Sequence, residues 1–385
     1  MSDAWQLETV GSIGAVDPAA WDACAGADNP FVSHAFLSAL EDSRSVGGRS
    51  GWLVHHALLR DESGRLAACA PLYGKTHSYG EYVFDHAWAQ AYDNVGGSYY
   101  PKLLCAVPFT PVPGPRLLVR PDAPPEVAGA FATGLIEIAR RSGLSSLHIN
   151  FTTRAEWELL GRAGFLQRLG QQFHWENRGY ASFDDFLAAL SSRKRKQIRK
   201  ERQEALADGI SIRVLSGPEI GRKDWDAFFR FYMSTSDRKW GSAYLNRAFF
   251  DLLGERLGDK VVLVMAERNG RWIGGALNLR GSDALYGRNW GCDGEWRYLH
   301  FEACYYQAIE YAIRHGIARV EAGAQGTHKI QRGYLPVETY SAHWFADLRL
   351  ADGVARFLER EREAVRMRNA ELEEFSPFKE TVEVG

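Results

Sequence analysis

The strongest constraint on the fold is an ordered set of elements that occurs twice along the chain. In the first half, a helical segment with Ser33 as its N-cap precedes two apolar runs, 52–59 and 66–72. In the second half, a helical segment capped by Asn246 precedes the runs 261–267 and 272–279, with Asn-Gly between them. Asn-Gly between two apolar runs is a strong hairpin signal. The repeated order predicts two copies of one α/β unit.

The parallel between the halves continues beyond the hairpins. Helical segments at 131–143 and 301–316 each end on glycine and lead into the apolar runs 144–149 and 317–322. A helix closed by glycine before an apolar run is typical of a C-capped helix that feeds a sheet. Each half then reaches a His-Trp pair, which we interpret as packing on equivalent strands. Chance alternation of helices and strands is the alternative, but six elements in one order favour duplication.

The length of 385 residues exceeds one compact core of ordinary size and predicts more than one domain. From the repeat we expect an N-terminal domain at 1–180, a basic connecting helix at 181–209, a second domain at 210–350 and a C-terminal helix with a tail at 351–385. In that helix Val354, Phe357 and Leu358 form an apolar stripe. The stretch 73–115, rich in Gly, Pro and aromatic residues, is interpreted as an insertion that lines a cleft between the two domains.

Charge and cysteine content exclude several classes of protein. The net charge of −2 gives no global attraction to nucleic acid or membranes. The first residues lack a signal-peptide pattern, and no apolar run reaches the length of a membrane span. Five widely spaced cysteines without C-x-x-C indicate reduced thiols, so we expect a cytoplasmic protein. No metal-ligand spacing occurs, so we predict no metal site.

The segment 182–207 has a cap-like start and then becomes densely basic. Seven cations lie between 193 and 202, and only Glu201 and Glu204 offset them. Such a run is usually a solvated helix face. The alternative is a site for the phosphates of RNA, a nucleotide-linked substrate or a lipid head group. The residues predicted for phosphate or RNA binding are Arg195, Arg199, Lys200 and Arg202.

A polar loop directly follows the last run of the second repeat, in "EAGAQGTHKIQRGYLP" at 321–336. Loops at strand ends are where open sheets place their chemistry. We predict Lys329, Tyr334 and His328 as catalytic residues, with Glu321 and Arg332 as substrate-binding residues. The cations would neutralise a developing oxyanion or a phosphate. Alternatively, they only fasten the loop. As an exposed cation, Lys329 is expected to contribute little to stability.

Further substrate-binding candidates lie in polar and aromatic stretches of both halves. Residues 82–94 form either a pocket for an acceptor amine or an aromatic surface whose polar tips stay in contact with water. The candidates in this stretch are Asp85, His86, Trp88 and Asp93. In the second half, Arg288 and Trp290 alternate onto one face of a strand, and Trp240 follows a helix that could line the same cleft.

Several long stretches resemble a known family. Residues 289–336 and the basic segment with the Gly-Ile that follows it resemble the Fem-type aminoacyltransferases. More closely, "NPFVSHAFL" (29–37), "YGEYVFDHAWA" (79–89) and "GAQGTHKIQRGYLP" (323–336) are similar to FemAB-like proteins described as peptidoglycan biosynthesis or recognition proteins. The resemblance covers roughly 29–345. It implies a mixed α/β and α+β fold of two tandem GNAT-like domains, and acyl transfer to an amine.

One departure bears on the acyl donor. GNAT domains that use acetyl-CoA bind its pyrophosphate with a loop of the form Arg/Gln-x-x-Gly-x-Gly/Ala at a helix N-terminus. The corresponding stretch here, 292–300, has one glycine and two acids, which repel pyrophosphate. Fem-type enzymes have also lost this loop and take aminoacyl-tRNA, and their well-studied members do not depend on one dominant protein base.

Three functions remain open at this point. The first is Fem-like transfer from aminoacyl-tRNA to a small-molecule or peptide amine, with tRNA as a partner and no tightly bound cofactor. The second is an acyl-CoA-dependent N-acyltransferase. The third is a non-catalytic protein that binds a phosphorylated cell-wall precursor or RNA. Ester aminolysis is downhill, so orientation and oxyanion stabilisation could suffice for the first.

Overall fold

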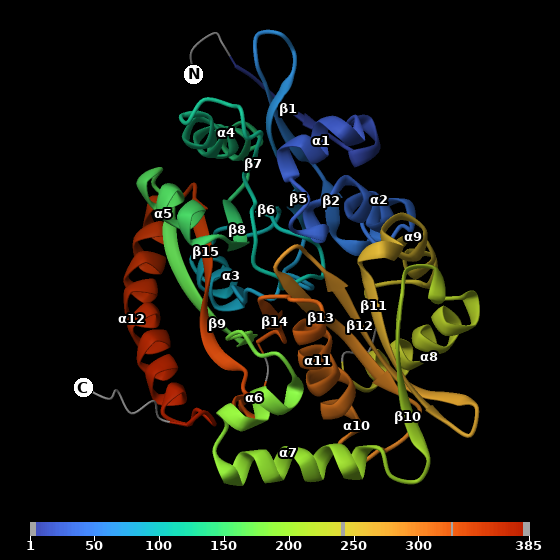
Figure 1. Cartoon of the computed structure of the whole chain (residues 1–385). Coiled ribbons are helices and arrows are strands. Elements are labelled where there is room, and N and C mark those ends of the chain that lie inside the picture. The colour runs from blue at the N-terminus through green and yellow to red at the C-terminus, as the bar shows by residue number, and fades with distance from the viewer. Residues whose placement is uncertain (1–4, 240–242, 325, 380–385) are drawn as a thin grey trace. The chain divides into compact units, whose positions relative to one another are not determined.

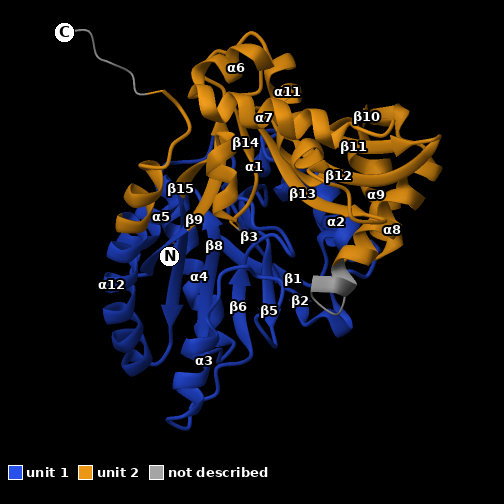
Figure 2. Cartoon of the chain, turned by 90° about the horizontal axis from the view of Figure 1, so that it is seen from below, with its two compact units in different colours: residues 1–170, 338–366 blue, residues 171–337, 367–385 orange. Residues whose placement is uncertain are grey.

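The computed structural model describes residues 5–239, 243–324 and 326–379. The chain forms two compact units, 1–170 with 338–366 and 171–337 with 367–385 (Figure 2). Each unit combines two chain segments, because strand β9 (Leu166–Glu176) begins in unit 1 and ends in unit 2. Strand β15 (Leu335–Phe345) begins in unit 2 and ends in unit 1. The predicted domain ranges, 1–180 and 210–350, follow the sequence repeat, whereas each compact unit takes segments from two parts of the chain.

Unit 1 contains two sheets and the helices that pack on them (Figure 1). Its helices are α1 (Pro18–Ala25), α2 (His34–Asp42), α3 (His86–Asp93), α4 (Val127–Arg141), α5 (Arg154–Arg162) and most of α12 (Leu348–Glu373). Besides parts of β9 and β15, its strands are β1 (Gln6–Val10), β2 (Trp52–Val54), β3 (His56–Arg60), β4 (Leu66–Ala70), β5 (Leu72–Lys75), β6 (Lys102–Cys105), β7 (Leu118–Val119) and β8 (Ser146–Thr152).

The predicted strands of the first hairpin each divide between two sheets. β1, β3, β4 and β7 form an antiparallel four-stranded sheet, whereas β2 pairs with β5 in the order β2-β5-β6-β8-β15. The run 52–59 breaks at His55, and the run 66–72 breaks at Pro71. Pro71 has no N–H for a ladder, so the paired strands leave one sheet there and enter the other. The alanine-rich β4 packs with α4 in the main apolar core of the unit.

Unit 2 is built around a sheet of six strands. Its helices are α6 (Phe183–Ala189), α7 (Ser192–Ala205), α8 (Arg222–Lys239), α9 (Arg247–Leu257), α10 (Leu299–Phe301) and α11 (Gln307–Arg314), with a π-helical turn at Glu302–Tyr306 before α11. Its strands are β10 (Ile210–Ser216), β11 (Val261–Arg268), β12 (Arg271–Arg280), β13 (Ala284–Cys292), β14 (Arg319–Glu321) and the end of β9.

The unit 2 sheet is covered on both faces. On one face Ala276 packs with Val264 and with Ala303 of the π-helical turn. On the other face Gly291 lets α8 approach closely, since a Cβ there would lie 2.1 Å from the carbonyl oxygen of Phe231. β13 and β14 are parallel, and β14 pairs antiparallel with β9. A parallel β13-helix-β14 connection places the end of β14 and the loop after it at one edge of the core.

The predicted order of elements is found in both halves. Asn246 caps α9 by accepting from the N–H of Phe249, and β11 and β12 form the predicted hairpin. The His-Trp pairs lie at equivalent positions. His174 of β9 pairs with Glu321 of β14, and His343 of β15 pairs with His148 of β8.

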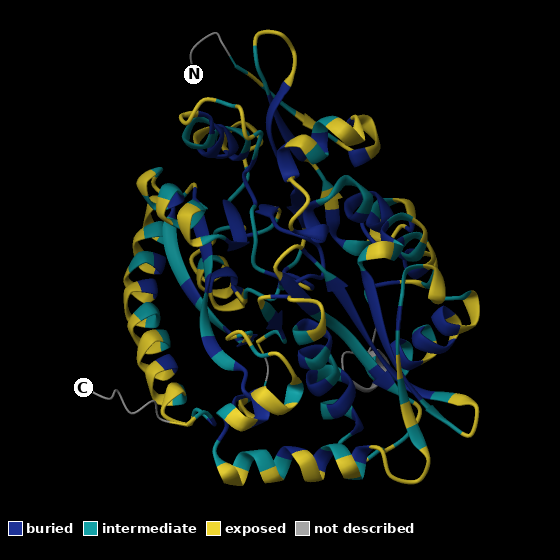
Figure 3. Cartoon of the chain, viewed as in Figure 1, coloured by how far each residue is buried: buried dark blue, intermediate teal, exposed yellow. Residues whose placement is uncertain are grey.

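Two sequence-based expectations about helices need correction. The segment 182–207 is not one helix, because Leu190 is extended and bridges to Phe378, so α6 ends and α7 starts anew at Ser192. α12 is the expected amphipathic helix, and buried and exposed positions alternate along it (Figure 3). Val354 and Leu358 are buried, but Phe357 is 40% exposed and lies outside the buried stripe. Within the described residues, no helix has both the length and the apolar character needed to cross a membrane.

We expect Gly333→Ala to destabilise the protein more than Gly316→Ala. Both glycines have positive φ, 88° and 64°, which costs alanine about 1 kcal/mol. Only at Gly333 would the Cβ also meet a side chain, 2.9 Å from the Phe186 ring, and overpacking there adds about 1–3 kcal/mol. Urea unfolding of the two variants measures the difference. Equal costs would contradict this packing around Gly333.

Candidate functional site

The loop after β14 is shaped by three glycines with positive φ. Gly323 (φ 74°) and Gly326 (φ 95°) turn the chain away from the end of the strand. A 3-10 turn, Thr327–Arg332, follows and ends on Gly333 in the left-handed conformation. A side chain at Gly326 would collide with the ring of His328 at 2.3 Å. These backbone conformations are accessible to glycine at little cost, so the loop can fold back onto the strand end.

Lys329 folds back from the 3-10 turn and caps the end of the strand. Its Nζ donates to the carbonyl oxygens of Ala322 (2.5 Å) and Gly323 (3.1 Å). The residue is only 4% exposed, so the expectation of an exposed cation is wrong. Burial lowers the pKa of Lys329 to about 8. Both the charged and the neutral form of the side chain are therefore accessible close to neutral pH. Its two hydrogen bonds also hold the loop against the end of the strand.

Both terminal nitrogens of the Arg332 guanidinium are hydrogen-bonded within unit 2. Its Nη2 donates to both carboxylate oxygens of Glu201 on α7, at 2.8 and 2.9 Å, and its Nη1 donates to the carbonyl of His328. The guanidinium also stacks 3.5 Å from the ring centre of Phe301. A buried bidentate pair of this kind leaves little of Arg332 for a substrate.

His328 and Tyr334 occupy very different positions. His328 is exposed, and its Nε2 lies 3.2 Å from the hydroxyl of Tyr305. Burial, together with Arg332 and Lys329, lowers the pKa of His328, so the imidazole is neutral at neutral pH. Tyr334 is fully buried and donates to the carbonyl of Tyr305, so its hydroxyl is committed to the fold. Among the three predicted catalytic residues, only His328 faces solvent.

Glu321, the last residue of β14, is a buried carboxyl with one unused oxygen. Oε1 accepts from Nε of Arg319 at 2.9 Å, and Oε2 has no hydrogen-bond partner among the described residues. Burial raises the pKa of Glu321 to about 7, although Arg319 opposes the shift. His174 approaches Oε2 at 3.8 Å, but burial lowers its pKa to about 3. This contact is therefore between a neutral imidazole and a carboxyl that titrates near neutrality.

The residues that support this loop were not predicted. Glu201 binds Arg332 and also accepts from the hydroxyl of Tyr306. Glu302, completely buried, accepts from Arg202 and from Gln307. Tyr306 and Glu302 lie in the π-helical turn, a feature that is rare and often marks functional sites. The only sequence signal was the presence of Glu201 within a basic run.

Three of the seven cations of the basic helix form ion pairs with described residues of unit 2. Arg202, predicted to bind phosphate, instead forms ion pairs with Glu302 and Glu310, at 2.9 and 2.8 Å, and stacks on Phe183. Among the exposed cations, Arg199 pairs with Asp184, and Lys200 pairs with Glu204. Arg195 contacts only the hydroxyl of Ser192 among the described residues. The exposed side of α7 keeps cations that a phosphate could reach, but Arg202 is not one of them.

Asp85 lies in a buried charge network of unit 1. Nζ of Lys102 contacts Oδ2 of Asp85 and lies 2.8 Å from Oε2 of Glu81, and Tyr99 also donates to Asp85 at 2.8 Å. Burial raises the pKa of Asp85, but the ammonium of Lys102 outweighs it, and the pKa is lowered. Burial raises the pKa of Glu81 to about 7 and lowers the pKa of Lys75, 3.9 Å away, to about 7. Because these side chains are buried, an acceptor amine cannot reach the network in this structure.

The other predicted substrate residues are scattered. Trp88 is buried in unit 1 against His343 and Phe345, whereas His86 and Asp93 are exposed on α3. Arg288 and Trp290 are half-buried on β13, and the charge of Arg288 reaches Glu321. Trp240 lies outside the described residues. No group of three or more His, Cys, Asp and Glu in the described chain is arranged to hold a metal ion.

Comparison with solved structures defines the class of fold. The C-terminal domain of a putative lysylphosphatidylglycerol synthetase from Agrobacterium fabrum superposes with a TM-score of 0.56 at 9% identity, covering 90% of this chain and 96% of that one. FemX superposes at 0.55 and 11%, covering 88% and 98%. The L-PGS of Bacillus licheniformis superposes at 0.52 and 10%, covering 86% and 98%. The fold is thus the tandem GNAT-like acyltransferase fold expected from the sequence.

The particular family follows from the sequence match. The model of the FemAB-like family, described as peptidoglycan biosynthesis/recognition, matches residues 12–380. The chain therefore belongs to the FemAB-like family. No curated protein matches the sequence. The prediction of an acyltransferase is confirmed at the level of family and fold.

We expect Asp85→Asn to destabilise the protein by about 3–5 kcal/mol, because it removes one partner of a buried ion pair and leaves Lys102 undercompensated. Asp93→Asn is the matched control on the other end of α3, where the carboxylate is exposed, and it should change stability by less than about 0.5 kcal/mol. Thermal and urea unfolding measure both. A negligible cost for Asp85→Asn would contradict the network.

Glu321→Gln should alter the pH dependence of stability. The folded pKa of Glu321 is raised, so the unfolded state loses its proton first and folding stability falls as pH rises from about 4.5 to about 7. Over this window the penalty reaches on the order of 3 kcal/mol, and Gln cannot titrate. Between these pH values the unfolding free energy of the wild type should therefore fall by up to about 3 kcal/mol relative to that of Glu321→Gln.

The control is Glu359→Gln, on the exposed side of α12, which should leave the slope of unfolding free energy against pH unchanged. Parallel pH profiles for wild type and Glu321→Gln would show that Glu321 titrates normally and would remove its candidacy as a base near neutrality.

Proposed function

We propose that this FemAB-like protein transfers an aminoacyl group from tRNA to an amine acceptor, with the chemistry at the end of β14. The observation that carries the proposal is that two buried ionisable groups lie at the end of β14 and in the loop that follows it. Glu321 titrates near pH 7 with one carboxyl oxygen unused, and Lys329 titrates near pH 8 within the loop that follows. A base and a cation with pKa values close to neutrality are what amine acylation requires.

In the proposed reaction, the acceptor amine attacks the ester carbonyl of the donor. A C–N bond forms, the C–O bond to the ribose breaks, and the amine gives up one proton, which the leaving oxygen finally takes. Glu321 holds that proton between the two steps. Lys329 has three N–H donors, of which two serve Ala322 and Gly323, so the third is available to the oxyanion.

The stretch 292–300 favours an aminoacyl ester over acyl-CoA. Asp293 accepts from the indole of Trp296 at 3.0 Å, and Arg297 is paired with Glu204. Acids and committed side chains therefore occupy the place where GNAT enzymes cradle pyrophosphate. The family description supports an acceptor related to peptidoglycan precursors. The exposed cations of α7, Arg195, Arg199 and Lys200, are proposed to contact tRNA phosphates, and a cytoplasmic location is part of the same proposal.

The test is a transfer assay with charged bulk tRNA and labelled amino acids, offered to cytoplasmic peptidoglycan precursors as acceptors. Acyl-CoA replaces charged tRNA in a parallel reaction. The proposal expects label in the acceptor only with charged tRNA. Transfer from acyl-CoA alone would reverse the choice of donor, and the absence of transfer from either, with intact precursor binding, would favour a binding protein.

Lys329→Met should lose on the order of 10²-fold in turnover, measured per folded molecule, because an oxyanion donor is removed. It should also lose stability, because Lys329 caps two strand-end carbonyls. Arg332→Gln is the comparison, since it breaks the other anchor of the loop but removes no proposed catalytic group. If both variants keep normal turnover once corrected for the folded fraction, Lys329 is an anchor only.

A further inference from the structure

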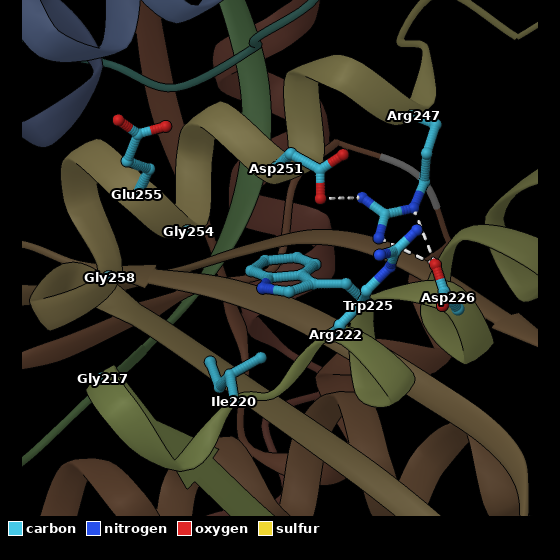
Figure 4. A pocket seen from close by; sticks show the side chains of 10 residues that line it. All are labelled: Gly217, Ile220, Arg222, Trp225, Asp226, Arg247, Asp251, Gly254, Glu255 and Gly258. Atoms are coloured by element: carbon cyan, nitrogen blue, oxygen red, sulfur yellow. Dashed lines mark hydrogen bonds and ion pairs between the residues drawn. The ribbon is translucent and has the colours of Figure 1, made fainter.

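Unit 2 contains a pocket of about 610 Å³ that the acyl-transfer proposal does not use (Figure 4). It lies between the segment preceding α8, the first turns of α8, and α9. None of its lining residues belongs to the loop after β14. The volume falls within the range of small-molecule sites. Its lining combines one aromatic ring, several glycines and charges of both signs.

Trp225 provides the aromatic wall. The residue is 5% exposed and packs against Gly254 of α9, where a Cβ would lie 2.8 Å from Nε1 of the indole. Glycine at this position therefore allows the α9 backbone to lie on the ring. The indole N–H has no acceptor among the described residues. A ligand in the pocket would find an apolar ring face with one unsatisfied donor.

The charges of the pocket are unevenly paired. Arg247 is shared by Asp226 and Asp251, with Nη···Oδ1 separations of 2.8 and 2.5 Å. Arg222 and Glu255 form no ion pair with any described residue, and both are exposed. Figure 4 shows Glu255 apart from the other charged side chains, and the guanidinium of Arg222 next to Arg247 and Asp226. The charge of Arg222 helps to lower the pKa of Asp226. The pocket thus offers a carboxylate at Glu255 and a guanidinium at Arg222, neither of which forms an ion pair with a described residue.

We propose that this pocket binds a short zwitterionic ligand, an amino acid or a peptide with free amino and carboxyl ends. The ammonium pairs with Glu255, the carboxylate pairs with Arg222, and the body of the ligand lies on Trp225. Three carboxylates against two guanidinium groups disfavour a phosphate or polyanion. A purely apolar ligand would leave Arg222 and Glu255 desolvated without compensation. The inference stands on the pocket alone and is independent of acyl transfer.

The experiment measures binding of alanine, trialanine and two capped trialanines, one N-acetylated and one C-amidated, by calorimetry on the full chain. The uncapped peptide should bind at least tenfold more tightly than either capped form, because each cap removes one charge. Added salt should weaken the uncapped peptide more than the capped forms. The NMR signal of the Trp225 indole N–H, assigned by its loss in Trp225→Phe, should shift when the peptide binds.

Two pairs of variants locate the site. Arg222→Gln and Glu255→Gln should each weaken trialanine at least tenfold, whereas Lys223→Gln and Asp259→Asn, exposed neighbours that do not line the pocket, should not. All four changes are at exposed positions, and circular dichroism checks that each variant is folded. Equal binding of capped and uncapped peptides, unchanged affinity of both pocket variants, or no binding at millimolar peptide would overturn the proposal.

Discussion

The loop that carries the candidate site begins where β14 ends, and the pairing of this short strand fixes the position of the loop. β14 has only three residues, and it is paired by β13 on one side and by the end of β9 on the other. The chain must then leave unit 2 to form β15. Beyond β14 the carbonyl of Gly323 still accepts from the N–H of Phe173 in β9, and Lys329 donates to this carbonyl and to that of Ala322. The buried cation therefore reinforces the strand end at the point where the chain turns away.

The same reasoning explains the basic helix. Arg332 anchors the loop to Glu201 of α7, and Arg202 of α7 anchors the π-helical turn through Glu302. Removing one member of such a buried pair costs more than the pair contributes, because the other charge is stranded. Cations at 193–202 thus divide into two groups with different tasks. Arg202 faces inward and holds unit 2 together, whereas the exposed members remain accessible to an anionic partner.

Local pattern was sufficient for the order of elements but not for the partners of charged side chains. The cap at Asn246 and the Asn-Gly turn act within a few residues, so the sequence revealed the helix and hairpin there. The break at Leu190 depends on Phe378, far along the chain, and no local signal predicted it. Asp85 was seen as a polar residue near aromatics, but its partner Lys102 lies in β6, 17 residues further along the chain. Burial of Lys329 was missed because its acceptors are backbone carbonyls, which no pattern of side chains reveals.

The duplicated strand pair carries different ionisable groups in the two units. His174 opposes Glu321 in unit 2, and His343 opposes His148 at the equivalent position in unit 1. Nε2 of His148 lies 3.2 Å from the hydroxyl of Tyr99 and 2.9 Å from that of Ser146, and the Nδ1 atoms of His148 and His343 lie 2.7 Å apart.

The two imidazoles of unit 1 are thus hydrogen-bonded to each other. Burial keeps the pKa of both well below the usual value, so neither takes up charge near neutral pH. At the matching position unit 2 has a carboxyl that titrates near pH 7 and has an unused oxygen. A group can exchange protons with a substrate only if both of its states are accessible at working pH. By that criterion Glu321 can exchange a proton near neutral pH at this strand pair and the two imidazoles of unit 1 cannot, while Glu81 and Lys75, whose pKa values also lie near 7, are found elsewhere in unit 1.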